Sequence, residues 1–189
     1  FSIGSLLAPQ GLYFDKSHTW AFLEKNGSVK IGVNDFLLHV SGEITRIQHK
    51  KTGESVEKGE KIMTLSQKGK QIHLTSPITG TIDSENIGLS LDPSKLTSSP
   101  FENGWVLSIS PKNWQKESQL MLMTDSYKEW INNEFSRLKE FLQSAIAMHQ
   151  GTAQLVLQDG GEITDKPLAQ FGPEVWEDFQ TQFIDQSNN

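Results

Sequence analysis

The feature that most constrains the fold is a series of short apolar runs, separated by glycine-containing turn signals, between residues 12 and 111. The strand-like runs cover residues 29–33, 44–47, 62–65, 72–74 and 105–109. The turn signals are Asn26-Gly27, Thr52-Gly53, Lys58-Gly59, Lys68-Gly69, Thr79-Gly80 and Asn103-Gly104. Many short strands with regularly spaced turns predict a β-sandwich or barrel.

The hydrophobic period changes after residue 112, where a helical stripe replaces the short runs. The stripe consists of Tyr127, Trp130, Ile131, Leu138, Phe141, Leu142 and Ala145, with Glu134 as its one polar member. Ser126 and Glu129 have the spacing of a capping box, and Gly151 is a plausible stop. The sequence therefore predicts an amphipathic helix over residues 126–150.

Residues 151–189 are expected to form a strand, a turn and a helix. The run 153–157 is strand-like, and Asp159-Gly160-Gly161 follows it as a turn. Gly172-Pro173 opens a helix whose apolar face carries Val175, Trp176, Phe179 and Phe183. The last residues, 186–189, are expected to fray. The predicted fold is thus mainly β with flanking helices, an α+β chain with a C-terminal helical extension.

Composition excludes several classes of function. The net charge is −6, which argues against a nucleic-acid platform. The absence of cysteine excludes thiolate zinc sites, iron–sulfur clusters and thiol nucleophiles. No apolar stretch is long enough to span a membrane. Residues 1–11 look like a leader, so an upstream anchor is possible, and the compartment stays open between the cytoplasm and attachment to a membrane through such a segment.

Catalytic and metal-binding patterns are missing. The histidines His18, His39, His49, His73 and His149 have no metal-ligand spacing, and no Gly-x-Ser-x-Gly motif occurs. We expect no enzyme activity and no metal. An enzyme site would require a cleft lined by His149, Asp159 and Glu162. His18 is expected to have a structural or a surface role.

An ordered set of motifs resembles the glycine cleavage system H protein family. The set is Tyr13-Phe14-Asp15-Lys16-Ser17-His18-Thr19-Trp20, Ile31-Gly32-Val33-Asn34-Asp35-Phe36, Gly42-Glu43-Ile44, Gly53-Glu54-Ser55-Val56-Glu57-Lys58-Gly59-Glu60, Ser76-Pro77-Ile78-Thr79-Gly80, Asp92-Pro93, Leu96, Pro100-Phe101, Gly104-Trp105 and, more loosely, Ser126-Tyr127. The resemblance covers residues 12–131. It implies a lipoyl-type barrel-sandwich hybrid over residues 12–125, with residues 150–189 outside the family pattern.

The resemblance also implies where a lipoyl lysine should lie. Family members carry lipoate on a hairpin lysine seven residues before the serine of the Ser-Pro step, and counting back from Ser76 reaches Gly69. Counting forward from Gly59-Glu60 reaches the same position. Ser66, Lys70 and Gln71 stand where the family has an acidic residue and small residues. The apex, Gln67-Lys68-Gly69-Lys70, is expected to be a plain β-turn.

Two functions follow from this departure. The first is a non-catalytic binding or scaffolding protein without lipoate, acting on unidentified protein partners. The alternative is a lipoylated carrier modified on Lys68 or Lys70, which shuttles a group between enzymes. We favour the first and expect both lysines to be solvated charges at the hairpin tip. The aromatic residues of the C-terminal third are expected to be mostly core, and any exposed one would indicate an interface.

Overall fold

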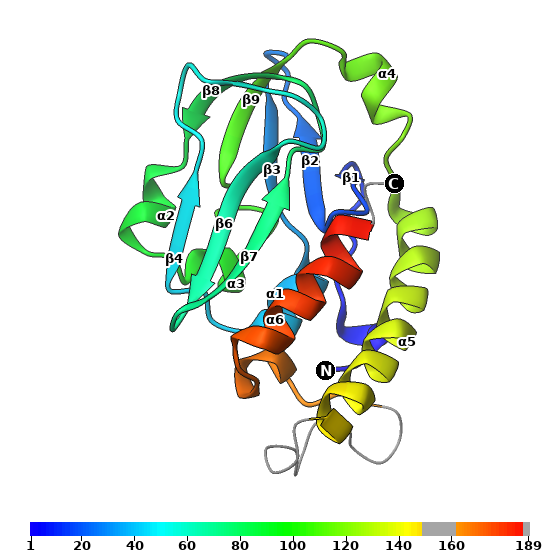
Figure 1. The fold of residues 1–189 in the computed structure, drawn as a ribbon. Coiled ribbons are helices and arrows are strands. Elements are labelled where there is room, and N and C mark those ends of the chain that lie inside the picture. Colours follow the sequence, from blue (N-terminus) through cyan, green and yellow to red (C-terminus); the bar gives the residue numbers. More distant parts are fainter. Residues whose placement is uncertain (149–161, 187–189) are drawn as a thin grey trace.

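The structure, a computed structural model, describes residues 1–148 and 162–186 and contains two β-sheets flanked by helices (Figure 1). The strands are β1 (Tyr13–Phe14), β2 (Thr19–Leu23), β3 (Val29–Val33), β4 (Arg46–His49), β5 (Ser55–Val56), β6 (Lys61–Gln67), β7 (Lys70–Thr75), β8 (Gly80–Glu85) and β9 (Leu107–Pro111). The α-helices are α1 (Asp35–Ser41), α2 (Ile87–Leu91), α3 (Lys95–Ser98), α4 (Trp114–Ser118), α5 (Thr124–Met148) and α6 (Pro173–Phe179).

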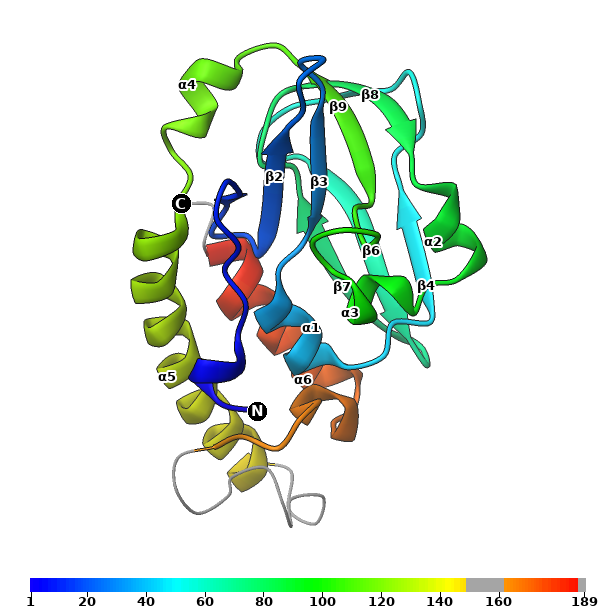
Figure 2. The same cartoon turned by 180° about the vertical axis from the view of Figure 1, so that it is seen from behind.

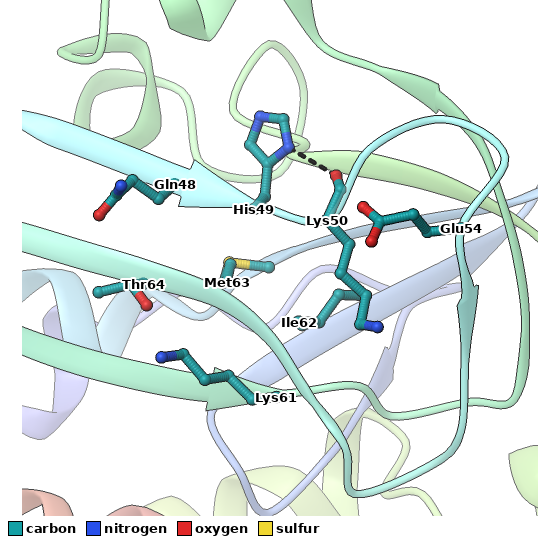
Figure 3. Close-up of a pocket in the computed structure, with 8 residues that line it drawn as sticks. All are labelled: Gln48, His49, Lys50, Glu54, Lys61, Ile62, Met63 and Thr64. Atoms are coloured by element: carbon teal, nitrogen blue, oxygen red, sulfur yellow. Dashed lines mark hydrogen bonds between the residues drawn. The ribbon is translucent and has the colours of Figure 1, made fainter.

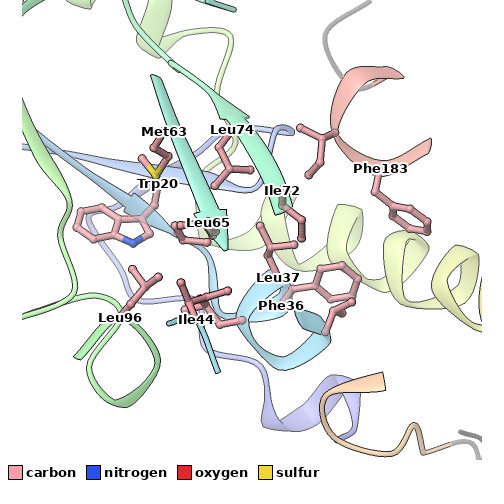
Figure 4. Close-up of a cluster of buried hydrophobic side chains, with 14 of the residues drawn as sticks. Trp20, Phe36, Leu37, Ile44, Met63, Leu65, Ile72, Leu74, Leu96 and Phe183 are labelled. Carbon is pink, nitrogen blue, oxygen red and sulfur yellow. The ribbon is translucent and has the colours of Figure 1, made fainter. Parts of the chain in front are cut away.

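The strands form a six-stranded sheet in the order β1-β2-β3-β9-β8-β5 and a three-stranded sheet in the order β4-β6-β7. Neighbouring strands are antiparallel, with Ala21, Ile31 and Leu107 in register across β2, β3 and β9. Apolar side chains of both sheets are buried, among them Leu65 and Ile72 of the small sheet (Figure 4). This arrangement confirms the predicted mainly-β fold with flanking helices, in which the turn pattern indicated the sheets and the helical stripe indicated the long helix.

Two predicted strands lie two residues further along the chain. The run 44–47 becomes β4 (Arg46–His49), because helix α1, which was not predicted, ends only at Gly42. Asn34 caps α1 by accepting a 3.0 Å hydrogen bond from the Leu37 amide. The run 105–109 becomes β9 (Leu107–Pro111). The residues that begin each run already lie beside a neighbouring strand, because the Thr45 amide donates to Ser66 and the Val106 amide donates to Ile31.

Thr79-Gly80 is not a turn, contrary to the prediction. Gly80 begins β8 and pairs with Pro111 of β9. A Cβ atom at this position would lie 2.3 Å from the main-chain oxygen of Ser110. This glycine is therefore required by the close approach of two strands and not by a reversal of the chain.

Helix α5 buries the predicted stripe, apart from Trp130, which is half-buried. The helix begins at Thr124, two residues before the expected start, so Ser126 lies inside the first turn and does not act as the cap. The expected end at residue 150 and the stop at Gly151 lie outside the described residues, as do the predicted strand 153–157 and the turn 159–161.

The C-terminal segment, residues 162–186, lies between β7 and α5 (Figure 1). It contains a 3₁₀ helix (Pro167–Gln170), α6, which begins at Pro173 as predicted, and a π-helical stretch (Gln180–Asp185). Phe179 and Phe183 are buried and stack on each other with ring centres 4.5 Å apart, and Phe141 of α5 packs against both. The expectation that most C-terminal aromatic residues are core is confirmed.

The N-terminal residues run along the opposite side of the molecule, between α1 and α5 (Figure 2). The Phe1 ring stacks on His39 and meets Phe36 and Phe135 edge-on. Ile3, Leu6 and Ala8 are also partly buried against the core, so part of residues 1–11 packs against the body of the protein. In residues 1–148 and 162–186, no helix is long and apolar enough to cross a membrane.

Candidate functional site

The β6–β7 hairpin is the candidate site, because its apex holds the position at which the family resemblance expects a modified lysine. Gln67 pairs with Lys70, so the turn has two residues, Lys68 and Gly69. Both have positive φ, 47° and 82°. Two positive φ angles in a two-residue loop define a type I′ turn, the connection that matches strand twist. The apex is thus the plain β-turn that was predicted.

Gly69 at this apex has no amine, so it cannot form the amide through which lipoate attaches to lysine. A Cβ atom built here would meet no heavy atom within 4 Å. A side chain is therefore disfavoured by the left-handed backbone and not by crowding.

Lys68 and Lys70 differ sharply, although they flank the same glycine. Lys68 is exposed. Lys70 is only 9% exposed. Its Nζ atom donates to the main-chain oxygens of Ala169 (2.9 Å) and Phe171 (3.0 Å). The expectation that both lysines are solvated charges is wrong for Lys70, because the C-terminal segment folds over it.

The surroundings of Lys70 bear on its charge. Its Nζ atom lies 5.0 Å from the ring centre of Trp176, where a cation is attracted by the aromatic face. Burial, and secondarily the charge of Lys68, lowers the pKa of Lys70 below its usual value. The two carbonyl contacts compensate for this cost by satisfying the amine.

Gln67, at the base of the hairpin, is buried. Its side-chain amide donates to the main-chain oxygens of Glu43 (2.7 Å) and Ser41 (3.3 Å). These bonds attach the end of β6 to the C-terminal end of α1. The apex thus projects from a fixed base.

The outer edge of β7 is held by a side chain of the C-terminal segment. The His73 amide donates to Gln180 Oε1 (2.8 Å), and Gln180 Nε2 donates to the His73 carbonyl (2.9 Å). Burial lowers the pKa of His73, and the Lys61 charge adds to this effect. Sequence reasoning missed Gln180, because no local pattern connects residues 107 positions apart.

His18 is fully buried, which decides between the two roles left open for it. It has a left-handed backbone (φ 65°), and its Nδ1 atom lies 3.1 Å from Asn34 Nδ2. Its ring stacks on Phe36. Burial, helped by the charge of Arg137, lowers its pKa to about 3. His18 is therefore a neutral core residue.

A polar pocket of about 350 Å³ lies at the end of β6 away from the turn (Figure 3). Its lining includes His49, Lys50 and Lys61. Lys50 pairs with Glu60 at 2.7 Å, and His49 Nδ1 bonds to the Lys50 carbonyl. Lys50 and His49 thus already have partners, and the pocket lies apart from the hairpin apex.

No cluster of metal-ligating side chains occurs among the residues that the structure describes. Glu162 is exposed, whereas His149 and Asp159 lie outside those residues. The enzyme site considered for these three side chains therefore gains no support from the geometry.

The two sheets share one core, and the β6–β7 turn is exposed at the end of the small sheet. This arrangement defines a lipoyl-type barrel-sandwich hybrid. The sequence model of the glycine cleavage H-protein family matches residues 12–134. The chain therefore belongs to the glycine cleavage H-protein family. Proteins of this family are carriers and not catalysts, which agrees with the expectation that the chain is not an enzyme.

Individual relatives extend this result. The chain is 26% identical over 131 residues to a probable glycine cleavage system H protein of Pyrococcus abyssi, covering 69% of this chain and 97% of that protein. It is 31% identical over 123 residues to a Picrophilus torridus protein of the same description, covering 65% and 95%. A glycine cleavage system H protein structure from Mycobacterium marinum aligns with a TM-score of 0.56 at 21% identity, covering 66% of this chain and 98% of that chain. The family match ends at residue 134, before the C-terminal segment.

Proposed function

We propose that this H-protein family member is an unlipoylated, non-catalytic binding module for protein partners. The observation that carries the proposal is Gly69, which occupies the hairpin apex and has no amine to modify. The fold keeps the hairpin, its base and its exposed turn. In this proposal it uses them as a surface and not as an attachment point.

The structure weighs against lipoylation of Lys70. Its amine donates to two carbonyls and lies beneath Trp176. A lipoyl amide would have one N–H in place of three donors and would have to pull the side chain out of this contact. The alternative function, a lipoylated carrier, therefore rests on Lys68.

Lys68 supports that alternative through its exposure at the turn. It stands one residue before the expected position, however, and adjacent turn residues project their side chains differently. An enzyme that recognises the apex lysine by position would meet Gly69 there. We therefore retain the unlipoylated module as the proposed function.

The test is the intact mass of the full-length protein from its native host, with peptide mapping of residues 61–75. An unmodified mass, from cells whose other lipoyl proteins are modified, supports the proposal. A mass increment of one lipoyl amide on Lys68 or Lys70 would refute it and make the chain a carrier with a displaced attachment site.

A further inference from the structure

Strand β7 ends the three-stranded sheet, and its outer edge is occupied by a side chain in place of a strand. His73 exchanges two hydrogen bonds with the Gln180 amide. A neighbouring antiparallel strand makes the same pair of bonds at such a residue. A bond from Gln180 Nε2 to Asp185 Oδ1 (2.8 Å) orients the amide. Gln180 thus acts as a short substitute for a partner strand.

The contact between β7 and the C-terminal segment is incompletely filled. A cavity of about 340 Å³ runs along it, lined by Gly69, Lys70 and His73 on the hairpin side and by Trp176 and Gln180 on the other. Gln180 begins a π-helical stretch, a rare geometry that often marks functional positions. The contact between β7 and the C-terminal segment, called the seam below, therefore has room for additional atoms.

Charge distinguishes the two sides of this seam. Residues 61–75 contain three lysines, at positions 61, 68 and 70, and no acidic residue. Residues 173–186 contain four acidic residues, Glu174, Glu177, Asp178 and Asp185, and no lysine or arginine. The whole chain has a net charge of −6, so the hairpin is a locally basic segment of an acidic chain, in which Lys61 and Lys68 are exposed and Lys70 is covered. Opposite charge favours the orientation and the encounter of such surfaces.

We propose that the edge of β7 is a docking surface for an acidic amphipathic helix of a partner protein, and that the C-terminal segment covers this surface until the partner displaces it. The proposal deepens the proposed function, because it names the surface that a binding module would use and the chemistry of its partner. The cover already has that chemistry: an acidic helix with a buried aromatic face and one amide directed at the strand edge. The C-terminal segment competes with the partner for the same surface. The apparent affinity for the partner therefore equals the intrinsic affinity multiplied by the fraction of chains in which the segment has left the surface.

Hydrogen exchange of the intact wild-type chain tests whether the C-terminal segment (residues 162–186) leaves β7 without unfolding of the rest of the protein. The His73 amide is held by Gln180, whereas Ile72 pairs with Leu65 inside the sheet. We expect the His73 amide to exchange at least ~10-fold faster than the Ile72 amide, because local opening requires less free energy than global unfolding. Equal exchange rates would mean that the cover leaves only when the whole protein unfolds, and would overturn the proposal.

Binding in trans tests the chemistry of the partner. The probe is a fluorescent synthetic peptide of residues 167–186, added to the full-length wild-type chain, to Gln180→Ala and to the control Gln182→Ala. Gln182 is exposed, and its contact with Arg137 uses the main-chain carbonyl, which the control keeps. We expect Gln180→Ala to bind the probe at least ~10-fold more tightly than the other two chains.

Matched probes separate the possible outcomes. A peptide with its four acidic residues changed to amides should bind more weakly, and added salt should weaken only the acidic probe. Equal affinity of all three chains for the probe would overturn the proposal that a partner displaces the C-terminal segment. If the Gln180→Ala chain dimerises and no longer binds the probe, the surface binds a second copy of this chain. That result would overturn the proposal of an acidic helix from a partner protein. None of these binding and exchange measurements depends on lipoylation. A lipoylated Lys68 would therefore refute the proposed function but not the docking surface.

Discussion

The burial of Lys70 gives the sharpest quantitative prediction, because Lys68 is a matched control two residues away. We consider Lys70→Met and Lys68→Met in the full-length chain. Methionine keeps a flexible apolar stem of similar length and removes the charged donor. The two variants therefore lose the same charge from the same hairpin, one from a buried site and one from an exposed site.

The expected loss at Lys70 follows from its contacts. Its amine donates to Ala169 and Phe171, and hydrogen bonds of charged donors contribute roughly 1.5–3 kcal/mol each. Part of this is offset, because desolvation of the amine disfavours its charged form. We expect Lys70→Met to lower the free energy of unfolding by about 2–4 kcal/mol, since two carbonyls lose their donor. Lys68→Met should stay within about 0.5 kcal/mol of the wild type.

Urea unfolding at pH 7, followed by tryptophan fluorescence and circular dichroism, measures both variants. Coincident transitions with similar m-values make the two free energies comparable. A Lys70→Met chain as stable as Lys68→Met would refute the reasoning, because it would mean that the Lys70 amine is solvated like its neighbour.

The remaining predictions concern four other positions, His18, Gly80, Gly69 and Glu117. Folding lowers the pKa of His18 from 6.5 to about 3. The stability that the neutral, buried His18 provides is therefore fully present above pH 6.5 and is lost as the pH falls towards 3. The loss amounts to on the order of 4–5 kcal/mol. The dependence of unfolding free energy on pH should therefore be flatter in His18→Gln, and parallel curves would contradict this. Gly80→Ala, which drives a Cβ atom against the main chain of β9, should cost about 3 kcal/mol. Gly69→Ala, with open space around it, should cost only about 1–2 kcal/mol. Urea unfolding, as for the lysine variants, measures both glycine substitutions. Glu117 accepts hydrogen bonds from the amide (2.8 Å) and hydroxyl (2.6 Å) of Thr79. Glu117→Gln should lower the free energy of unfolding by about 1–2 kcal/mol, because a neutral amide replaces the carboxylate that accepts both bonds. An unchanged melting temperature would argue against these bonds.

The turn chemistry of the β-domain could be predicted from local sequence. Lys68-Gly69 closes β6 onto β7, and Asn26-Gly27 separates β2 from β3, because positive φ angles at such positions favour glycine. The prediction failed at Gly80, where the same residue type serves close packing of strands. One sequence cannot distinguish these two uses of glycine, since both depend on the absence of a Cβ atom.

The sequence by itself determined the short antiparallel strands, the long amphipathic helix and the missing amine at Gly69, because turns, periodicity and side-chain chemistry are local properties. Only the tertiary structure decided the surroundings of those elements. It buried Lys70 under carbonyls 99 and 101 residues away and placed Gln180 on the His73 main chain. Such contacts form when separately folded surfaces dock, so the side chains that carry them have no periodic or spaced signal in the sequence.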